Sequence, residues 1–302
     1  MVDYKKVFIS RNFRRKLLSL FDFVPDIIIL KVQYYIKMGR KLNLDNPLRY
    51  TEKIQWYKLY YKNPLLPRLV DKCDVKQYIR EKGLEDIVVK DVGVYEKYEE
   101  INWSSLPDKY VIKDTLAGGG LSVILVKDKH NFNPISVKKL LNHWICIKRK
   151  KSDGREWPYY SGKSHRILIE EYLDSKTGLT DYKFFCFAGK IACIYVIGNR
   201  VVGNHGELAI MDEKFHRLPY QSKTQATMKK DPVMPPNFER MRDVAQTLSK
   251  DFPHVRVDLY NVDGKIYFGE LTFYGASGYQ QFEPDEFDYK LGEYFELKKY
   301  SV

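Results

Sequence analysis

Cysteine is scarce in this chain. The 302 residues contain four cysteines, Cys73, Cys146, Cys186 and Cys193. They are too few for a disulfide framework, and none stands at the paired spacing of a zinc site. We therefore expect reduced thiols packed in the core of a cytoplasmic protein.

Long apolar runs are also missing. The start, Met-Val-Asp-Tyr-Lys-Lys, lacks the pattern of a signal peptide. An apolar stretch from Phe21 to Ile36 is interrupted by Asp26 and Lys31, so we predict no membrane span. This stretch follows the basic residues Arg11, Arg14, Arg15 and Lys16. It would suit peripheral contact with the inner membrane face, but we favour packing against the protein's own core.

Acidic residues are fewer than basic ones. The chain has 39 Asp and Glu against 51 Lys and Arg, a net charge of +12. This surplus favours anionic partners such as nucleotides, acidic polysaccharides or an anionic membrane surface. The charge is spread along the chain, and no helix-turn-helix, RNP or zinc-finger pattern is present, so we expect no nucleic-acid partner.

The predicted secondary structure changes once along the chain, from mainly helices to mainly strands. Up to about residue 90 the sequence indicates helices, with Ile54 and Tyr57 on one face of a helix over about 49–60, and Gly83 as a helix stop. From Tyr110 onward strands dominate, interrupted by helices near 134–150 and 236–250. No internal repeat or low-complexity tract is present.

One predicted hairpin carries two acidic side chains. Val255, Val257 and Leu259 alternate with Arg256, Asp258 and Tyr260, as in a half-buried strand, and Asp263-Gly264 is a turn signal. A three-residue loop over Val262, Asp263 and Gly264 would place Arg256 opposite Glu270 and Asp258 diagonally on the same face. Two carboxylates at that spacing suit a hard cation such as Mg²⁺. The alternative is a solvated face with an Arg–Glu pair, which is equally plausible for this segment alone.

A glycine-rich loop is the second chemical signal. A strand carrying Lys113 runs into Gly118, Gly119 and Gly120, and a second apolar strand follows. Glycines allow backbone N–H groups to approach phosphate closely, and Lys113 adds a positive charge. The spacing is neither Walker A nor Rossmann. A plain hairpin turn with an exposed lysine is the more common origin of such a motif.

The third signal is a strand edge followed by charged residues. Glu170, Glu171, Tyr172 and Leu173 end one predicted strand, and Asp181 and Lys183 begin the next. Backbone groups at such an edge can read adenine, Asp181 can hold ribose hydroxyls and Lys183 can reach a phosphate. Judged alone, a strand and a hairpin with solvated charges is the simpler interpretation.

In this order the segments resemble the ATP-grasp superfamily, and within it the TupA-like group of teichuronopeptide and capsular polysaccharide biosynthesis proteins. The resemblance runs from about Asn43 to the C-terminus, and its landmarks are Asn46-Pro47, 51–56, Asp71-Lys72, 181–187 and 255–270. It implies an α+β ATP-grasp fold, in which two lobes grip the nucleotide. We expect a mainly helical region over 1–105, a nucleotide-lid lobe over 106–173 and a metal- and substrate-binding lobe over 174–302.

The resemblance also assigns roles to residues. It implies ATP binding by Lys76, Lys113, the Gly118–Gly120 loop, the hinge of Glu170, Glu171, Tyr172 and Leu173, and Asp181 and Lys183. It implies Mg²⁺ ligation by Asp258 and Glu270, with Thr272 in the place of the usual Asn, and a catalytic Arg256 assisted by Lys183. Tyr274, Ser277 and Gly278 belong to the loop that we expect to contact substrate.

The function implied is an ADP-forming, ATP- and Mg²⁺-dependent carboxylate–amine ligase of bacterial surface-polysaccharide biosynthesis. An anionic sugar or uronic-acid polymer and an amine, such as an amino acid, would be the substrates. Two alternatives stay open: a glycosyltransferase or sugar phosphotransferase of the same pathway, and a noncatalytic nucleotide-binding scaffold. The presence of both Asp258 and Glu270 favours an enzyme over a scaffold.

Overall fold

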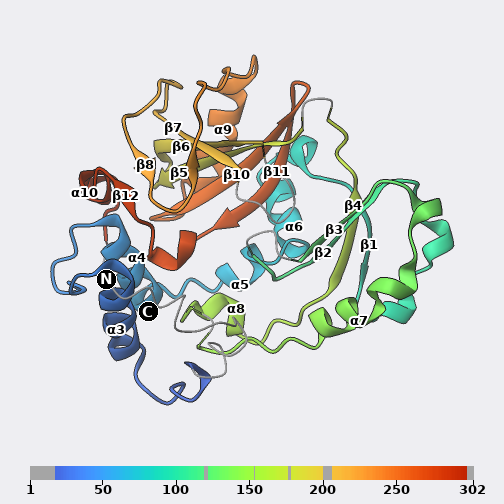
Figure 1. The fold of residues 1–302 in the computed structure, drawn as a ribbon, viewed down its shortest axis with the longest axis horizontal. Helices are drawn as coiled ribbons and strands as arrows, with labels where there is room; N and C mark the ends of the chain where they lie inside the picture. Colours follow the sequence, from blue (N-terminus) through green and yellow to red (C-terminus); the bar gives the residue numbers. More distant parts are fainter. Residues whose placement is uncertain (1–17, 119–121, 153, 176–177, 200–205, 298–302) are drawn as a thin grey trace.

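We describe the protein from a computed structural model that covers residues 18–118, 122–152, 154–175, 178–199 and 206–297. Two separate β-sheets dominate it, with helices packed around each (Figure 1). The α-helices are α3 (Asp26–Met38), α4 (Tyr50–Tyr60), α5 (Leu66–Leu69), α6 (Asp74–Glu81), α7 (Pro134–Ile145), α8 (Trp157–Tyr160), α9 (Phe238–Ser249) and α10 (Glu286–Tyr294). Short 3₁₀ turns are η1 (Glu85–Ile87), η2 (Tyr98–Glu100), η3 (Trp103–Ser105), η4 (Lys129–Asn131) and η5 (Gly275–Gly278).

The larger sheet has the strand order β11-β10-β5-β6-β7-β9. Its strands are β5 (Thr180–Phe187), β6 (Lys190–Gly198), β7 (Glu207–Met211), β9 (Ala226–Thr227), β10 (Val255–Val262) and β11 (Lys265–Thr272). All neighbours are antiparallel except β7 and β9. A separate two-stranded pair joins β8 (Gln221–Ser222) to β12 (Phe282–Glu283).

Helix α9 covers one face of the larger sheet and leaves the other for the polar residues of β10. Phe184 of β5 stacks on Phe238 of α9, and Val257 is the partner of Phe184 in the strand register. Since successive residues of a strand point to opposite faces, Arg256 and Asp258 lie on the face away from α9. The alternation predicted for this strand is confirmed.

The register predicted for the β10–β11 hairpin is wrong, although both carboxylates still reach one face. Asp263 and Gly264 have φ of 50° and 84° and form a two-residue loop, not a three-residue one. Gly269 is then an extra residue in β11, so Asp258 faces Glu270 directly. Arg256 faces Thr272, not Glu270.

Glycine is required at this bulge by a close backbone approach. A Cβ on Gly269 would lie 3.0 Å from the carbonyl oxygen of Asp258. Without the bulge, the two-residue loop would pair Asp258 with Gly269 and turn Glu270 to the α9 face.

The smaller sheet has the order β1-β4-β2-β3, all antiparallel. Its strands are β1 (Asp91–Tyr95), β2 (Tyr110–Asp114), β3 (Val123–Val126) and β4 (Ile167–Glu171), with α7 packed on the outside (Figure 1). The edge strand β1 falls within the range 1–105 that the sequence marks as mainly helical, but it belongs to this sheet.

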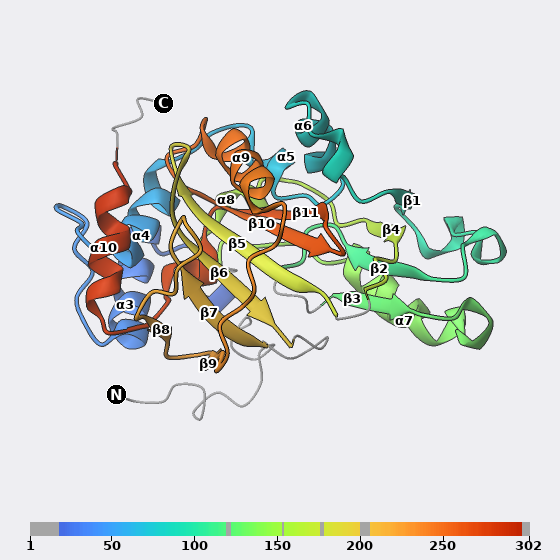
Figure 2. The same cartoon turned by 90° about the horizontal axis from the view of Figure 1, so that it is seen from above.

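Helices α4 and α10 lie side by side at the far end of the larger sheet (Figure 2). Tyr50 of α4 packs edge-on against Phe185 and Phe187 of β5. The carboxylate of Asp288 accepts hydrogen bonds from the backbone and hydroxyl of Thr51, at 2.9 and 2.7 Å. These contacts fix α4, and with it the loop that follows β11, against the sheet.

Helix α3 forms from the apolar stretch near the N-terminus. Leu30, Tyr34 and Met38 are buried, as expected for packing against the protein's own core. Among the residues that the structure describes, no helix is long and apolar enough to cross a membrane.

Candidate active site

The first group of the site lies on the polar face of β10 and β11. The Arg256 guanidinium donates to both Asp258 oxygens, with Nε–Oδ1 at 2.6 Å and Nη2–Oδ2 at 2.7 Å. Its Nη2 also reaches Glu270 Oε1 at 3.1 Å, and Thr272 Oγ1 donates to the same Glu270 oxygen at 2.9 Å. The structure therefore brings together Arg256, Asp258, Glu270 and Thr272, four residues named from the sequence.

Lys183 and Asp181 of β5 extend this group along the sheet. Lys183 is the register partner of Asp258, and its ammonium group donates to the Asp258 carboxylate. It also lies 3.7 Å from the buried carboxylate of Asp181. The face thus alternates positive and negative side chains.

Positive charges control the ionisation of Glu270. Burial would raise the pKa of this carboxyl, but Arg256, Lys183 and Lys72 outweigh burial and lower the pKa to about 2. Glu270 is therefore ionised at neutral pH. An ionised carboxylate is the state that binds cations.

The second group lies on the smaller sheet. Lys76 of α6 and Lys113 of β2 pair with the two oxygens of Glu170, a buried residue of β4. Lys76 also pairs with Asp91 of β1. Burial opposes the ionisation of Glu170, but the two lysines lower its pKa below the usual value. The structure thus places Lys76, Lys113 and Glu170 in one polar group.

The rest of the predicted nucleotide hinge is more open. Glu171 is exposed at the end of β4, and its backbone N–H donates to the carbonyl of Lys90 at 3.0 Å. Tyr172 and Leu173, which follow β4, are half-buried. Gly118 is exposed, and a Cβ there would meet no atom within 4 Å, whereas Gly119 and Gly120 lie outside the described residues.

Lys72 joins the two groups, and sequence reasoning gave it no role. Its ammonium group donates to the carbonyls of Asp114, at 3.1 Å, and Ala117, just before the glycine loop. Burial lowers the pKa of Lys72, and the charges of Glu270 and Asp114 oppose that effect. The sequence feature that could have identified Lys72 is the Asp71-Lys72 pair, which was used only to locate Lys76.

The predicted substrate loop is held by side chains from distant parts of the chain. Ser277, at φ 56°, accepts hydrogen bonds from Lys58 Nζ at its carbonyl (2.7 Å) and its hydroxyl (2.8 Å). The Ser277 hydroxyl donates to Glu156 at 2.5 Å. Burial lowers the pKa of Lys58 to about 7, although Glu156 favours its charged form. Lys58 and Glu156 therefore position this loop, and neither was identified from the sequence.

The other two residues named for this loop are buried. The ring of Tyr274 packs 5.8 Å from that of Tyr57. A Cβ on Gly278 would lie 2.4 Å from Gln55 Nε2, so glycine is required for the loop to approach α4. The structure places Tyr274 and Gly278 as packing residues around an exposed Ala276 and a half-buried Ser277.

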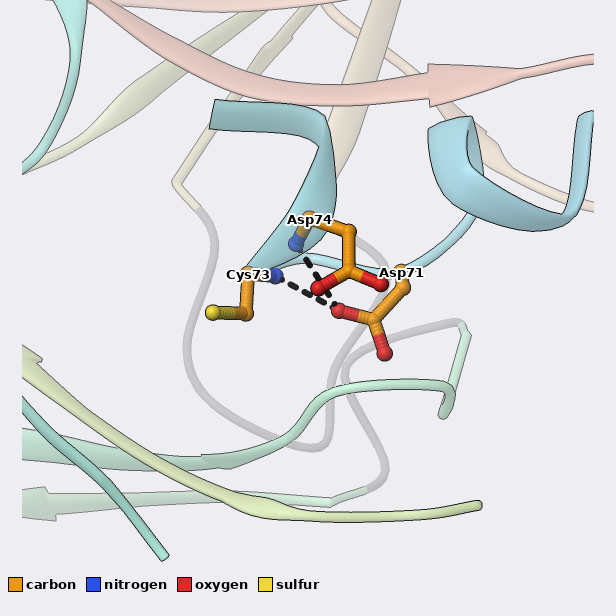
Figure 3. A group of neighbouring side chains, drawn as sticks. All are labelled: Asp71, Cys73 and Asp74. Carbon is orange, nitrogen blue, oxygen red and sulfur yellow. Dashed lines mark hydrogen bonds between the residues drawn. The ribbon is translucent and has the colours of Figure 1, made fainter. Parts of the chain in front are cut away.

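Within the described parts of the chain, one group of three metal-ligating side chains comes together: Asp71, Cys73 and Asp74 (Figure 3). Asp71 Oδ1 accepts the backbone N–H groups of Cys73 and Asp74, at 2.9 and 3.0 Å. Arg166 donates to both carboxylates, at 2.9 and 2.7 Å. The group is explained as an anchored start of α6.

Two separate β-sheets, with a pair of facing carboxylates on the larger one, form an α+β arrangement consistent with an ATP-grasp fold. The family model described as TupA-like ATPgrasp matches residues 52–296. The chain belongs to this TupA-like ATP-grasp family.

Several solved structures are similar in fold to parts of this chain. They include a D-alanine–D-alanine ligase from Bacillus anthracis, with 20% identity, a TM-score of 0.44, and coverage of 68% of this chain and 57% of that one. An L-amino acid ligase from Bacillus licheniformis has 11% identity and a TM-score of 0.43, with coverage of 85% of this chain and 55% of that one. N5-carboxyaminoimidazole synthetase from Staphylococcus aureus, complexed with ADP, has 12% identity and a TM-score of 0.40, with coverage of 68% of this chain and 44% of that one.

In each case the chain spans less than two thirds of the length of the other protein. A search of curated proteins gives no match. The family match therefore carries the assignment by itself.

Proposed function

We propose that this protein is an ATP- and Mg²⁺-dependent carboxylate–amine ligase that forms an amide through an acylphosphate. The observation that carries the proposal is the direct pairing of Asp258 with Glu270 beside Arg256 and Lys183. Lys76, Lys113 and Glu170 form a second group, and the charges of Glu270 in the first group and of Lys113 in the second both act on Lys72.

The donor set on β10 and β11 fits magnesium. Two carboxylates and the hydroxyl of Thr272 offer oxygen ligands on one face, and Glu270 is ionised at neutral pH. In the proposed complex Asp258 and Glu270 would hold the ion, which supplies neutralisation of phosphate charge. Arg256 and Lys183 pair with these carboxylates in the structure and would turn towards the anionic reactants.

The proposed chemistry has two steps. An oxygen of the substrate carboxylate bonds to the γ-phosphorus of ATP as the bond to ADP breaks, giving an acylphosphate and ADP. The amine nitrogen then bonds to the acyl carbon, inorganic phosphate leaves, and the nitrogen loses a proton. Lys76, Lys113 and Lys183 would balance phosphate charge, and Arg256 would stabilise the oxyanion.

We propose the synthesis of a bacterial surface polysaccharide at the cytoplasmic membrane face as the setting. The net charge of +12 favours an anionic sugar or uronic-acid polymer as one substrate, with an amine such as an amino acid as the other. A sugar-nucleotide transferase is less well supported, because its acidic metal motif usually follows a Rossmann-like strand, not an antiparallel hairpin. A scaffold would not need two carboxylates facing each other.

The exposed face of α3 supports membrane contact. Ile28, Val32, Tyr35 and Ile36 form an exposed stripe at helical spacing with Lys31 among them, and Phe23 is 85% exposed. We propose an anionic bilayer as the partner, since basic residues precede this helix in the sequence. The protein should sediment with vesicles that contain phosphatidylglycerol, and Val32→Asp should abolish this. Ile135→Asp, at an exposed position of α7, is the control; equal sedimentation of both variants would refute the contact.

Isotope transfer tests the ligase proposal. A carboxylate labelled with ¹⁸O should yield labelled inorganic phosphate in proportion to the amide formed, with ADP as the nucleotide product. Pools of uronic acids and amino acids supply the substrates, and mass spectrometry detects the products. Amide formed without label in the phosphate, or with release of AMP and pyrophosphate, would overturn the proposal.

A further inference from the structure

A cavity of about 770 Å³, wide open to solvent, lies outside the polar groups described above. It is bounded by α8, the segment between α4 and α5, and the start of α3. The lining residues that matter chemically are Trp157, Tyr160, Lys62, Lys151, Lys163 and Asp26. In Figure 1, α8 lies near α5, on the side of the molecule away from α9.

Positive charge dominates this lining. Its one acidic side chain, Asp26, pairs at 2.6 Å with Arg155, a buried residue behind the cavity, so its charge is already balanced. Lys62 donates to the carbonyl of Lys58 at 2.6 Å, and its ammonium group remains at the cavity wall. Burial lowers the pKa of Lys62 to about 8; Asp26 raises it and the charge of Lys151 lowers it further. An anion bound here would relieve the repulsion between these lysines.

Aromatic rings supply the second part of the lining. The indole N–H of Trp157 donates to the carbonyl of Tyr61 at 3.2 Å, which fixes the orientation of the ring. Lys62 Nζ lies 5.7 Å from the centroid of the Trp157 ring. A flat ring beside an ammonium group offers an apolar surface for the C–H face of a sugar and a charge for its acidic substituent.

Helix α8 also connects the cavity to the proposed reaction centre. Glu156, the residue before α8, holds the Ser277 hydroxyl of the substrate loop. Tyr159 belongs to the same helix. Burial raises its pKa, and the nearby charges of Glu156, Glu270 and Arg256 also affect it. Trp157 and Tyr160 of the same helix line the cavity. A ligand in the cavity would therefore lie on the other side of one helical turn from the substrate loop.

We propose that this cavity binds an acidic saccharide, a sugar unit carrying a carboxylate or a phosphate. As the acceptor or carboxylate donor of the ligase, this role rests on the proposed function; the binding itself does not. Trp157 and Tyr160 contact the sugar ring, and Lys62 and Lys151 face its acidic groups, because Lys163 is already paired with Asp74.

Calorimetry on the full chain without nucleotide tests the binding. Tetragalacturonic acid is the uronate probe and glucose 1-phosphate is the phosphate probe, with maltotetraose as neutral control and inorganic phosphate as sugar-free control. Binding of either acidic saccharide at least tenfold tighter than both controls supports the proposal and shows which acidic group the site prefers. No binding, or equal binding of a control, overturns it.

Variants then locate the binding in this cavity. Trp157→Ala and Lys151→Gln should each weaken the saccharide about tenfold, and Trp157→Phe should restore much of the affinity. Lys148→Gln, an exposed lysine outside the lining, is the matched control. Equal affinity in Lys151→Gln and Lys148→Gln overturns the assignment.

Nucleotide affinity separates the two proposals. The MgATP dissociation constant should stay at the wild-type value in the cavity variants. If no saccharide binds but ¹⁸O label still reaches phosphate, the cavity proposal is overturned and the ligase proposal stands. If saccharide binds but no label reaches phosphate, the ligase proposal is overturned and the cavity proposal stands.

Discussion

The facing carboxylates give the sharpest prediction, because their two conservative substitutions should agree in activity and differ in stability. Asp258→Asn and Glu270→Gln each remove one negative charge and keep the size of the side chain. The Asp258 side chain is 6% exposed and pairs with Arg256 and Lys183, whereas the Glu270 side chain is 37% exposed. The same chemical change is therefore made in two different environments.

The magnitudes follow from these environments. A buried hydrogen bond to a charged group contributes about 1.5–3 kcal/mol, so Asp258→Asn should lower the free energy of unfolding by roughly 2–4 kcal/mol. Screening by solvent limits the loss in Glu270→Gln to about 1 kcal/mol. If both carboxylates hold Mg²⁺ as proposed, each substitution should remove about 3 kcal/mol of transition-state stabilisation, or about a hundredfold in rate.

Two assays check this pattern. ADP release reports the reaction, and thermal melts with and without MgATP report binding, because a ligand at about a hundred times its Kd adds about 2.7 kcal/mol of stability. Asp263→Asn is the control: it makes the same change at the exposed turn of the same hairpin, where Asn tolerates the φ of 50°. Rates in both site variants equal to that of the control would refute the role of the carboxylates.

Two further substitutions test the rest of the site, and a third tests His254, a buried residue 3.1 Å from the hydroxyl of Tyr50. Lys72→Met should weaken MgATP binding about tenfold in calorimetry, since the ammonium group that holds the backbone before the glycine loop is lost; unchanged affinity would contradict this. Lys58→Met should lower the free energy of unfolding by about 1–3 kcal/mol in urea titrations through its two hydrogen bonds to Ser277, with MgATP affinity retained. Burial lowers the pKa of His254 from 6.5 to about 3, so the stability present above pH 6.5 is lost as the pH falls, by up to about 1.4 kcal/mol per pH unit. His254→Gln should show a shallower loss between about pH 6 and pH 4; equal slopes would show that another group titrates.

Local pattern was sufficient for the strands of the site. Alternating apolar residues determined β10, and Asp263-Gly264 determined where the chain turns, because both depend on neighbours in sequence. Lys113 before the glycine loop likewise lies on a strand, β2, as predicted. The order of these pieces along the chain carried the family resemblance, and the resemblance implied the fold.

The local sequence pattern could not predict the register between β10 and β11. Two- and three-residue loops both suit this turn, and only the bulge at Gly269 returns Glu270 to the face of Asp258. The bulge is set by how β11 closes on β10, where the carbonyl of Asp258 leaves no room for a side chain at Gly269.

The sequence by itself therefore determined which residue types stand on which strands, since a strand's period and a turn's φ are local properties. Only the tertiary structure decided that Lys58 and Glu156 hold Ser277 and that Lys72, between α5 and α6, reaches the backbone just before the glycine loop. The partners in these contacts lie far apart in the chain, and their side chains are polar residues that any solvated surface would also carry. What selects them is burial: once packing removes water from a charged group, it must find its counter-charge or hydrogen-bond partner within the fold.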